Sequence, residues 1–145
     1  MIKIISIGQS NDYQANINDY AKRLKNQYKI TFIDIENSKS KNIECRNIES
    51  EKILKHLDNK SYIILLDEIG KPINNLELNK TINIHNNITF IIGGSYGVSE
   101  KIKKSVNLTI KISDLIFPHE IVKLILTEQI YRSQCINENH PYHHI

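Results

Sequence analysis

Short runs of mostly apolar residues recur along this chain, separated by segments long enough to hold a helix. The clearest runs cover residues 1–8, 62–66 and 88–92 and are rich in Ile and Leu. A strand that is apolar at every position must be buried on both faces, as in a parallel sheet that helices cover from both sides. This pattern therefore predicts an α/β fold with a mostly parallel sheet flanked by helices.

The segments between these runs have helical spacing. In residues 13–28, apolar side chains recur every three or four positions and charged side chains lie between them, which is typical of an amphipathic helix. Three weaker helices are predicted over residues 48–57, 76–84 and 99–105. A long helix is predicted over residues 118–136. It begins with a proline, which is well tolerated in a first helical turn.

The remaining segments complete the alternation of strands and helices. Two further strands are predicted over residues 30–35 and 108–112. The polar stretch 36–47 is predicted to be a surface loop, and residues 137–145 a polar tail. The sequence contains no internal repeat or linker, so residues 1–145 are expected to form a single domain.

The composition excludes several classes of protein. Hydrophobic residues make up 40% and charged residues 24% of the 145 residues, as in an ordinary globular protein. The apolar runs are far shorter than the ~20 residues that cross a bilayer, and the N-terminus lacks the pattern of a secretory signal. We therefore expect a cytoplasmic protein without membrane contact. The net charge of +3 neither proves nor excludes an RNA partner.

Ligands of parallel sheets bind beyond the carboxyl ends of the strands. Three such ends carry distinctive residues, at positions 66–71, 93–97 and 113–119. The second holds three of the five glycines in the chain, which either form a tight turn or let the backbone approach a ligand closely. Their spacing matches neither G-x-G-x-x-G nor a P-loop, which disfavours dinucleotides and nucleoside triphosphates.

The predicted long helix carries more apolar surface than one sheet contact requires. A dimer interface would account for the excess. Glu128 and Arg132 lie four residues apart on this helix, and their spacing alone predicts an exposed ion pair.

The predicted tail is rich in histidine, since His140, His143 and His144 lie beside Tyr142. A solvated tail is one interpretation. A metal site is a weaker one, because the nearest thiol, Cys135, belongs to a different element. In a third, the tail folds over a ligand, since Tyr can stack on a base and His can exchange a proton near neutral pH.

Five short motifs occur in order along the whole chain. They are Leu66-Asp67-x-x-Gly70-Lys71, Ile92-Gly93-Gly94-x-x-Gly97-x-Ser99, Phe117-Pro118-His119, Glu128-Gln129-x-Tyr131-Arg132 and Asn139-His140-Pro141-Tyr142-His143. With these motifs in register, the chain resembles the large-subunit rRNA methyltransferase H family, which belongs to the SPOUT class of methyltransferases.

The resemblance implies a fold and an activity. Members of the family tie the C-terminal part of the sheet into a trefoil knot, an exception to the rule that chains stay unknotted, and they act as homodimers. The implied reaction transfers a methyl group from S-adenosylmethionine to N3 of a pseudouridine in 23S rRNA, with the assembled ribosome as partner and without a metal. The implied location is the cytoplasm.

The resemblance also assigns roles to individual residues. The implied cofactor contacts lie at the same three strand ends and are Leu66, Gly93, Ile112, Ser113, Asp114, Leu115, Ile116 and Phe117. The implied catalytic residues are His119, Tyr142 and His143, with the tail reaching the cofactor of the partner subunit. They must align the activated methyl group and assist loss of the N3 proton. The proton acceptor is one of these three side chains or a water molecule.

Two positions depart from the family pattern. Relatives often carry Arg where this chain has His144 and Lys123, and either change could weaken the binding of RNA phosphates. We expect His144→Arg to preserve or raise activity at pH 8.

Two alternative functions stay open. One is a non-catalytic, cofactor-binding module that docks on the ribosome. The other is a SPOUT methyltransferase with another RNA target, such as tRNA, which would normally need a further RNA-binding domain. The identity of the methylated nucleotide separates these alternatives.

Overall fold

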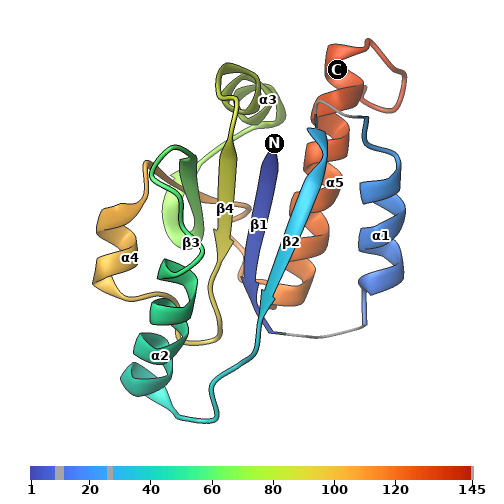
Figure 1. Cartoon of the computed structure of the whole chain (residues 1–145). Coiled ribbons are helices and arrows are strands. Elements are labelled where there is room, and N and C mark those ends of the chain that lie inside the picture. The colour runs from blue at the N-terminus through green and yellow to red at the C-terminus, as the bar shows by residue number, and fades with distance from the viewer. Residues whose placement is uncertain (9–11, 26–27, 145) are drawn as a thin grey trace.

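The computed structural model describes residues 1–8, 12–25 and 28–144 and contains a five-stranded parallel sheet in the order β2-β1-β4-β3-β5. The strands are β1 (Ile2–Ile7), β2 (Ile30–Ile35), β3 (Tyr62–Pro72), β4 (Ile88–Ile92) and β5 (Leu108–Lys111). The helices are α1 (Gln14–Lys22), α2 (Asn42–Leu54), α3 (Asn75–Ile84), α4 (Glu100–Ser105) and α5 (His119–Asn137). The predicted α/β fold with a parallel sheet is therefore confirmed (Figure 1).

The sheet is buried on both faces, because successive residues of each strand point to opposite sides. On one face, Ile4 and Phe90 belong to a core that includes Leu126 of α5. On the other face, Ile5 belongs to a second core that includes Ile53 of α2. These two cores explain why the central strands are apolar at most positions of both faces.

Helix α5 connects the edge of the sheet with its centre. It follows the edge strand β5 and then packs against β1 and β4 in the middle of the sheet. It also contacts α1 and α3 on the same face. Within the described ranges, no helix is both long and apolar enough to span a membrane.

Helix α1 is shorter than the predicted helix over residues 13–28. It ends at Lys22, and positions 26 and 27 of the prediction lie outside the described residues. Tyr28 continues the apolar spacing because its side chain is also in the core, with an exposed fraction of 2%. The spacing therefore identified Tyr28 correctly as a buried residue, but it overestimated the length of the helix.

Helix α2 corrects two predictions at once. It begins at Asn42, inside the predicted loop 36–47, and ends at Leu54, before the end of the predicted helix 48–57. Its buried face includes the polar residues Glu49 and Ser50. A sequence pattern that equates burial with apolar side chains cannot find such a face.

Strand β3 extends well beyond the predicted residues 62–66, to Pro72. Ile110 of β5 pairs with both Leu66 and Lys71, so the chain bulges between these two residues and then rejoins β5. Gly70 is required in the bulge, because a Cβ atom there would lie 2.4 Å from the carbonyl carbon of Ile110. The end of β3 beyond the bulge therefore pairs with the same strand, β5.

Candidate functional site

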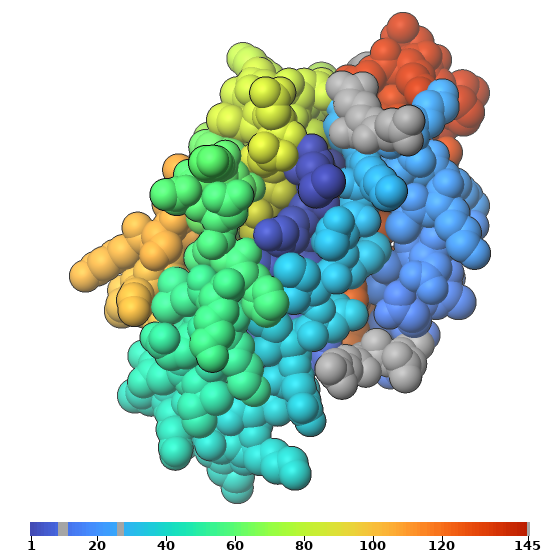
Figure 2. Space-filling view, viewed as in Figure 1, coloured from blue at the N-terminus to red at the C-terminus, as the bar shows by residue number. Residues whose placement is uncertain are grey.

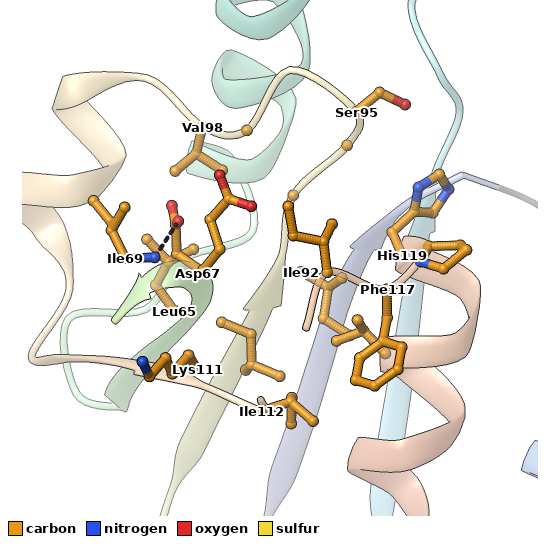
Figure 3. Close-up of a pocket in the computed structure, with 18 of the residues that line it drawn as sticks. Leu65, Asp67, Ile69, Ile92, Ser95, Val98, Lys111, Ile112, Phe117 and His119 are labelled. Atoms are coloured by element: carbon orange, nitrogen blue, oxygen red, sulfur yellow. Dashed lines mark hydrogen bonds between the residues drawn. The ribbon is translucent and has the colours of Figure 1, made fainter. Parts of the chain in front are cut away.

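A cavity of about 550 Å³ lies at the carboxyl ends of β3, β4 and β5. Residues 65–69, 92–98 and most of 111–119 form the greater part of its wall. Figure 3 shows Asp67 on one side of the cavity and His119 on the opposite side. The cavity therefore lies at the three strand ends that the sequence singled out, and its volume is typical of small-molecule sites.

Seven of the eight residues implied to contact a cofactor line this cavity. They are Leu66, Gly93, Ile112, Ser113, Leu115, Ile116 and Phe117. Leu115 and Ile116 are 72% and 79% exposed, so they present free apolar surface at its mouth. Asp114 does not line the cavity but forms an ion pair with Lys111, whose hydrogen bond holds the pKa of the Asp114 carboxyl below its ordinary value.

The glycine turn, residues 93–97, forms part of the cavity wall. The N–H of Gly97 donates to the carbonyl oxygen of Gly94 at 3.0 Å, and Gly97 has a φ of +74°. A Cβ atom at Gly94 would lie 2.6 Å from Oε1 of Glu49 and 3.0 Å from Cγ2 of Ile7. The tight-turn interpretation is therefore confirmed, and the turn leaves no space for a side chain at Gly94.

His119 begins α5 and forms another part of the wall. Gly8 makes room for its ring, since a Cβ atom at Gly8 would lie 2.6 Å from Nε2 of His119. The same Nε2 lies 3.6 Å from Oε2 of Glu120. Of the three residues predicted to be catalytic, His119 is the one that the chain places at its own cavity.

Helix α2 contributes two residues that the sequence analysis missed. Arg46 lines the cavity, and Glu49 lies directly behind Gly94 of the glycine turn. Glu49 is 2% exposed, and its Oε2 accepts a hydrogen bond from the N–H of Ser38 at 3.0 Å. The sequence feature that could have drawn attention to Arg46 was the rarity of arginine, since the chain has three arginines among 19 Lys and Arg residues.

The C-terminal tail folds back on the end of α5. The hydroxyl of Tyr142 donates to Oε1 of Glu128 at 2.8 Å, and Arg132 donates to the same oxygen at 2.6 Å. Nδ1 of His143 lies 3.2 Å from a guanidinium nitrogen of Arg132. Burial, with further contributions from Tyr20 and Glu128, raises the pKa of the Tyr142 hydroxyl. Tyr142 therefore remains a proton donor in this position.

Two predictions about polar residues of α5 need correction. Glu128 and Arg132 form the predicted ion pair at 2.6 Å, but their side chains are only 16% and 25% exposed, because the tail covers them. Lys123 is 7% exposed, and its Nζ lies 2.6 Å from Oδ1 of Asp34. A buried, paired ammonium group does not contact RNA phosphates, so Lys123 has a structural role.

His119 and the tail residues lie at opposite ends of α5. A helix of 19 residues spans ~27 Å between its first and last residues. Figures 1 and 2 show the tail at the upper end of the molecule, whereas the strand arrows in Figure 1 point toward the lower end. A single chain therefore does not bring His119 together with Tyr142 and His143.

The histidines of the tail contact neighbouring protein groups. Nδ1 of His140 accepts a hydrogen bond from the N–H of Tyr142 at 3.1 Å, and His143 contacts Arg132. In the part of the chain that the structure describes, no group of three His, Cys, Asp or Glu side chains is arranged to hold a metal ion.

Comparisons with known proteins agree on one family. Residues 1–143 match a family model described as "Predicted SPOUT methyltransferase". The chain is 45% identical to ribosomal RNA large subunit methyltransferase H of Dictyoglomus thermophilum, over 99% of each chain. It is 41% identical to the protein of the same name from Acholeplasma laidlawii and 34% identical to that from Campylobacter jejuni strain 81-176, over 98% of each chain in both cases.

These similarities cover the cavity and the tail alike, because they extend over nearly the whole chain. The sheet order and the cavity at the ends of β3, β4 and β5 are consistent with them. The chain therefore belongs to the SPOUT methyltransferases, in the family of ribosomal RNA large subunit methyltransferase H.

Proposed function

We propose that this protein is a cytoplasmic, S-adenosylmethionine-dependent methyltransferase that methylates N3 of a pseudouridine in 23S rRNA of the assembled ribosome. One observation carries the proposal. Seven of the eight implied cofactor residues surround a single cavity in a chain that is 41–45% identical to two proteins named ribosomal RNA large subunit methyltransferase H.

The residues of the cavity fit S-adenosylmethionine. Its volume suits a ligand of this size, and its wall combines apolar side chains with the backbone of the glycine turn. Arg46 lines the cavity, and its buried Nε has no hydrogen-bond partner among the described residues, so its guanidinium group remains available for a ligand. When bound, S-adenosylmethionine would supply a methyl group that its sulfonium already activates.

The residues of the chain then have to hold the target base and move one proton. The imidazole of His119 borders the cavity and accepts a proton in its neutral form. Tyr142 and His143 offer a ring face and hydrogen-bonding groups to a base that has been turned out of its stack. The raised pKa of Tyr142 favours His119, rather than Tyr142, as the proton acceptor.

A homodimer would unite these residues. Because ~27 Å of helix α5 separates His119 from the tail, Tyr142 and His143 would have to come from the partner subunit. Two copies packed with antiparallel α5 helices would place each tail near the other cavity. The exposed apolar side chains of Leu115 and Ile116, just before the start of α5, and the implied family dimer support this arrangement.

The trefoil knot belongs to the same proposal. Strand β3 bulges between Leu66 and Lys71, and both of these residues pair with Ile110 of β5. The chain then leaves β5 through residues 112–118 to begin α5 at the cavity. A knot at this point would hold the three wall segments in place without a ligand.

The test is transfer of labelled methyl from S-adenosylmethionine to ribosomes that lack this modification, with mass spectrometry to locate the product. We expect a methyl group on N3 of a pseudouridine in 23S rRNA. Methylation of a different nucleotide would indicate a different RNA target. Intact cofactor binding without transfer to any ribosomal substrate would favour the non-catalytic docking module.

A further inference from the structure

Helix α2 contributes one charged side chain, Arg46, to the wall of the cavity. Arg46 and Glu49 lie one turn apart on this helix, next to the glycine turn. We infer that Arg46 binds the carboxylate of the methionyl group of S-adenosylmethionine. This inference rests on the proposed function and extends it, because it names the residue that recognises the amino acid end of the ligand.

Helix α2 is attached to the glycine turn through two consecutive side chains. Glu49 lies against Gly94, where a Cβ atom would come within 2.6 Å of its Oε1. Ser50 accepts a hydrogen bond from the N–H of Ser99 at 2.8 Å, just beyond the turn. This attachment holds Arg46, one turn earlier in α2, at the cavity wall.

Arg46 differs from the other arginines of the chain. Arg23 pairs with Asp19 at 2.7 Å, and Arg132 pairs with Glu128 at 2.6 Å. The described residues provide Arg46 with no ion pair, and its buried Nε has no hydrogen-bond partner among them. A guanidinium group that borders a cavity and lacks a protein partner is suited to bind an anionic group of a ligand.

The other cations on the cavity wall are already paired. Lys111 forms an ion pair with Asp114, and Lys103 lies 3.5 Å from Glu100. Among the lysine and arginine side chains of the described wall, Arg46 is therefore the one that has no carboxylate partner. Its planar fork of N–H groups also matches a carboxylate in two parallel hydrogen bonds.

Glu49 supports the cavity wall from behind and does not form part of it. Its carboxylate is 2% exposed and lies against Gly94 of the glycine turn, outside the lining of the cavity. Arg46 is therefore the charged side chain of α2 that lines the cavity.

The alternative ligand of Arg46 is a phosphate of the RNA. A phosphate would bind outside the cavity, where a mobile lysine on the surface would serve as well. The place of Arg46 in the cavity wall and the burial of its Nε both favour the ligand inside the cavity. The experiment below separates the two ligands.

The test compares two ligands that differ only in the carboxylate, S-adenosylmethionine and its decarboxylated form. Their affinities for the full-length protein and for Arg46→Gln are measured by titration calorimetry. We expect the substitution to weaken the binding of S-adenosylmethionine between about tenfold and a hundredfold, as for a charged hydrogen bond. The decarboxylated ligand should bind both proteins within about twofold.

Two further variants sharpen this comparison. Arg46→Lys keeps the charge but loses the planar fork, so its affinity for S-adenosylmethionine should lie between those of the wild type and Arg46→Gln. Lys52→Gln removes one positive charge from the same helix at a residue that does not line the described cavity. It should leave the affinities of both ligands unchanged.

Three results would overturn the inference. Equal weakening of both ligands would give Arg46 a structural role. Unchanged affinity of Arg46→Gln for S-adenosylmethionine, together with slower methylation of ribosomes, would assign Arg46 to an RNA phosphate. Failure of the wild-type protein to bind S-adenosylmethionine would refute the proposed function itself, and this result is visible before any variant is compared.

Discussion

At the scale of single residues, several polar side chains of this protein are buried together with a specific partner. Lys123 of α5 pairs with Asp34 at the end of β2, and Ser6 of β1 donates a hydrogen bond to the same carboxylate oxygen at 3.1 Å. Nζ of Lys123 also lies 5.1 Å from the centroid of the Phe32 ring. These contacts attach α5 to the edge of the sheet that lies farthest from β5.

We predict that Lys123→Met lowers the free energy of unfolding by about 2 kcal/mol, because it leaves the Asp34 carboxylate without its ion-pair partner. Lys123→Arg should retain the pair and change stability by less than about 1 kcal/mol. Urea denaturation measures both effects. Lys80→Met, the same change on the exposed surface of α3, serves as the control. Wild-type stability of Lys123→Met would contradict the structural role of this lysine.

At the scale of secondary structure, α2 decides the shape of one side of the cavity. It begins at Asn42, which has a φ of +57°, a conformation that most residues other than glycine and asparagine avoid. Cys45, Glu49 and Ser50 then face the interior of the protein. The start of the helix at Asn42 therefore controls which side chains of α2 face the glycine turn.

We predict that Asn42→Ala lowers the free energy of unfolding by about 1 kcal/mol, whereas Asn42→Gly does not lower it. The physical reason is the positive φ of this residue, which a Cβ atom without a local hydrogen-bonding group disfavours. Chemical denaturation of the two variants provides the measurement. The control is Asn47→Ala, which makes the same change inside α2 and should not reduce stability. Equal stability of Asn42→Ala and Asn42→Gly would argue against this explanation.

At the scale of the whole molecule, the cavity and the tail are separated by the length of α5. His119 lies at the first residue of this helix, and the tail packs against Tyr131 and Arg132 near its last turn. The ring centroids of Tyr131 and Tyr142 are 4.8 Å apart. A site that uses both ends of α5 therefore requires a second copy of the chain.

This separation predicts that two defective chains complement one another. A heterodimer of one subunit with His119→Ala and one with His143→Ala would contain one intact site, if each tail serves the cavity of its partner. We expect this heterodimer, purified with two different tags, to have about half of the wild-type methylation rate. Each mutant homodimer should be strongly impaired. An inactive heterodimer would show that the cavity and the tail of the same chain act together.

Local patterns in the sequence were sufficient to predict the sheet and the strand ends around the cavity. Residues 62–66, and residues 88–92 apart from Thr89, are apolar because both faces of the sheet are covered, and this requirement is visible without a structure. The glycines at 93–97 also mark the turn that follows β4. These features depend on residues that are close together along the chain.

The position of α2 and the partners of its polar side chains were not predictable in this way. Glu49 binds Ser38 and lies against Gly94, and Ser50 binds Ser99, which is 49 residues away in the sequence. Burial of polar side chains is stable only when such distant partners are in place, so no local pattern announces it. The folded chain alone brings Arg46 to the cavity and keeps Tyr142 and His143 away from it.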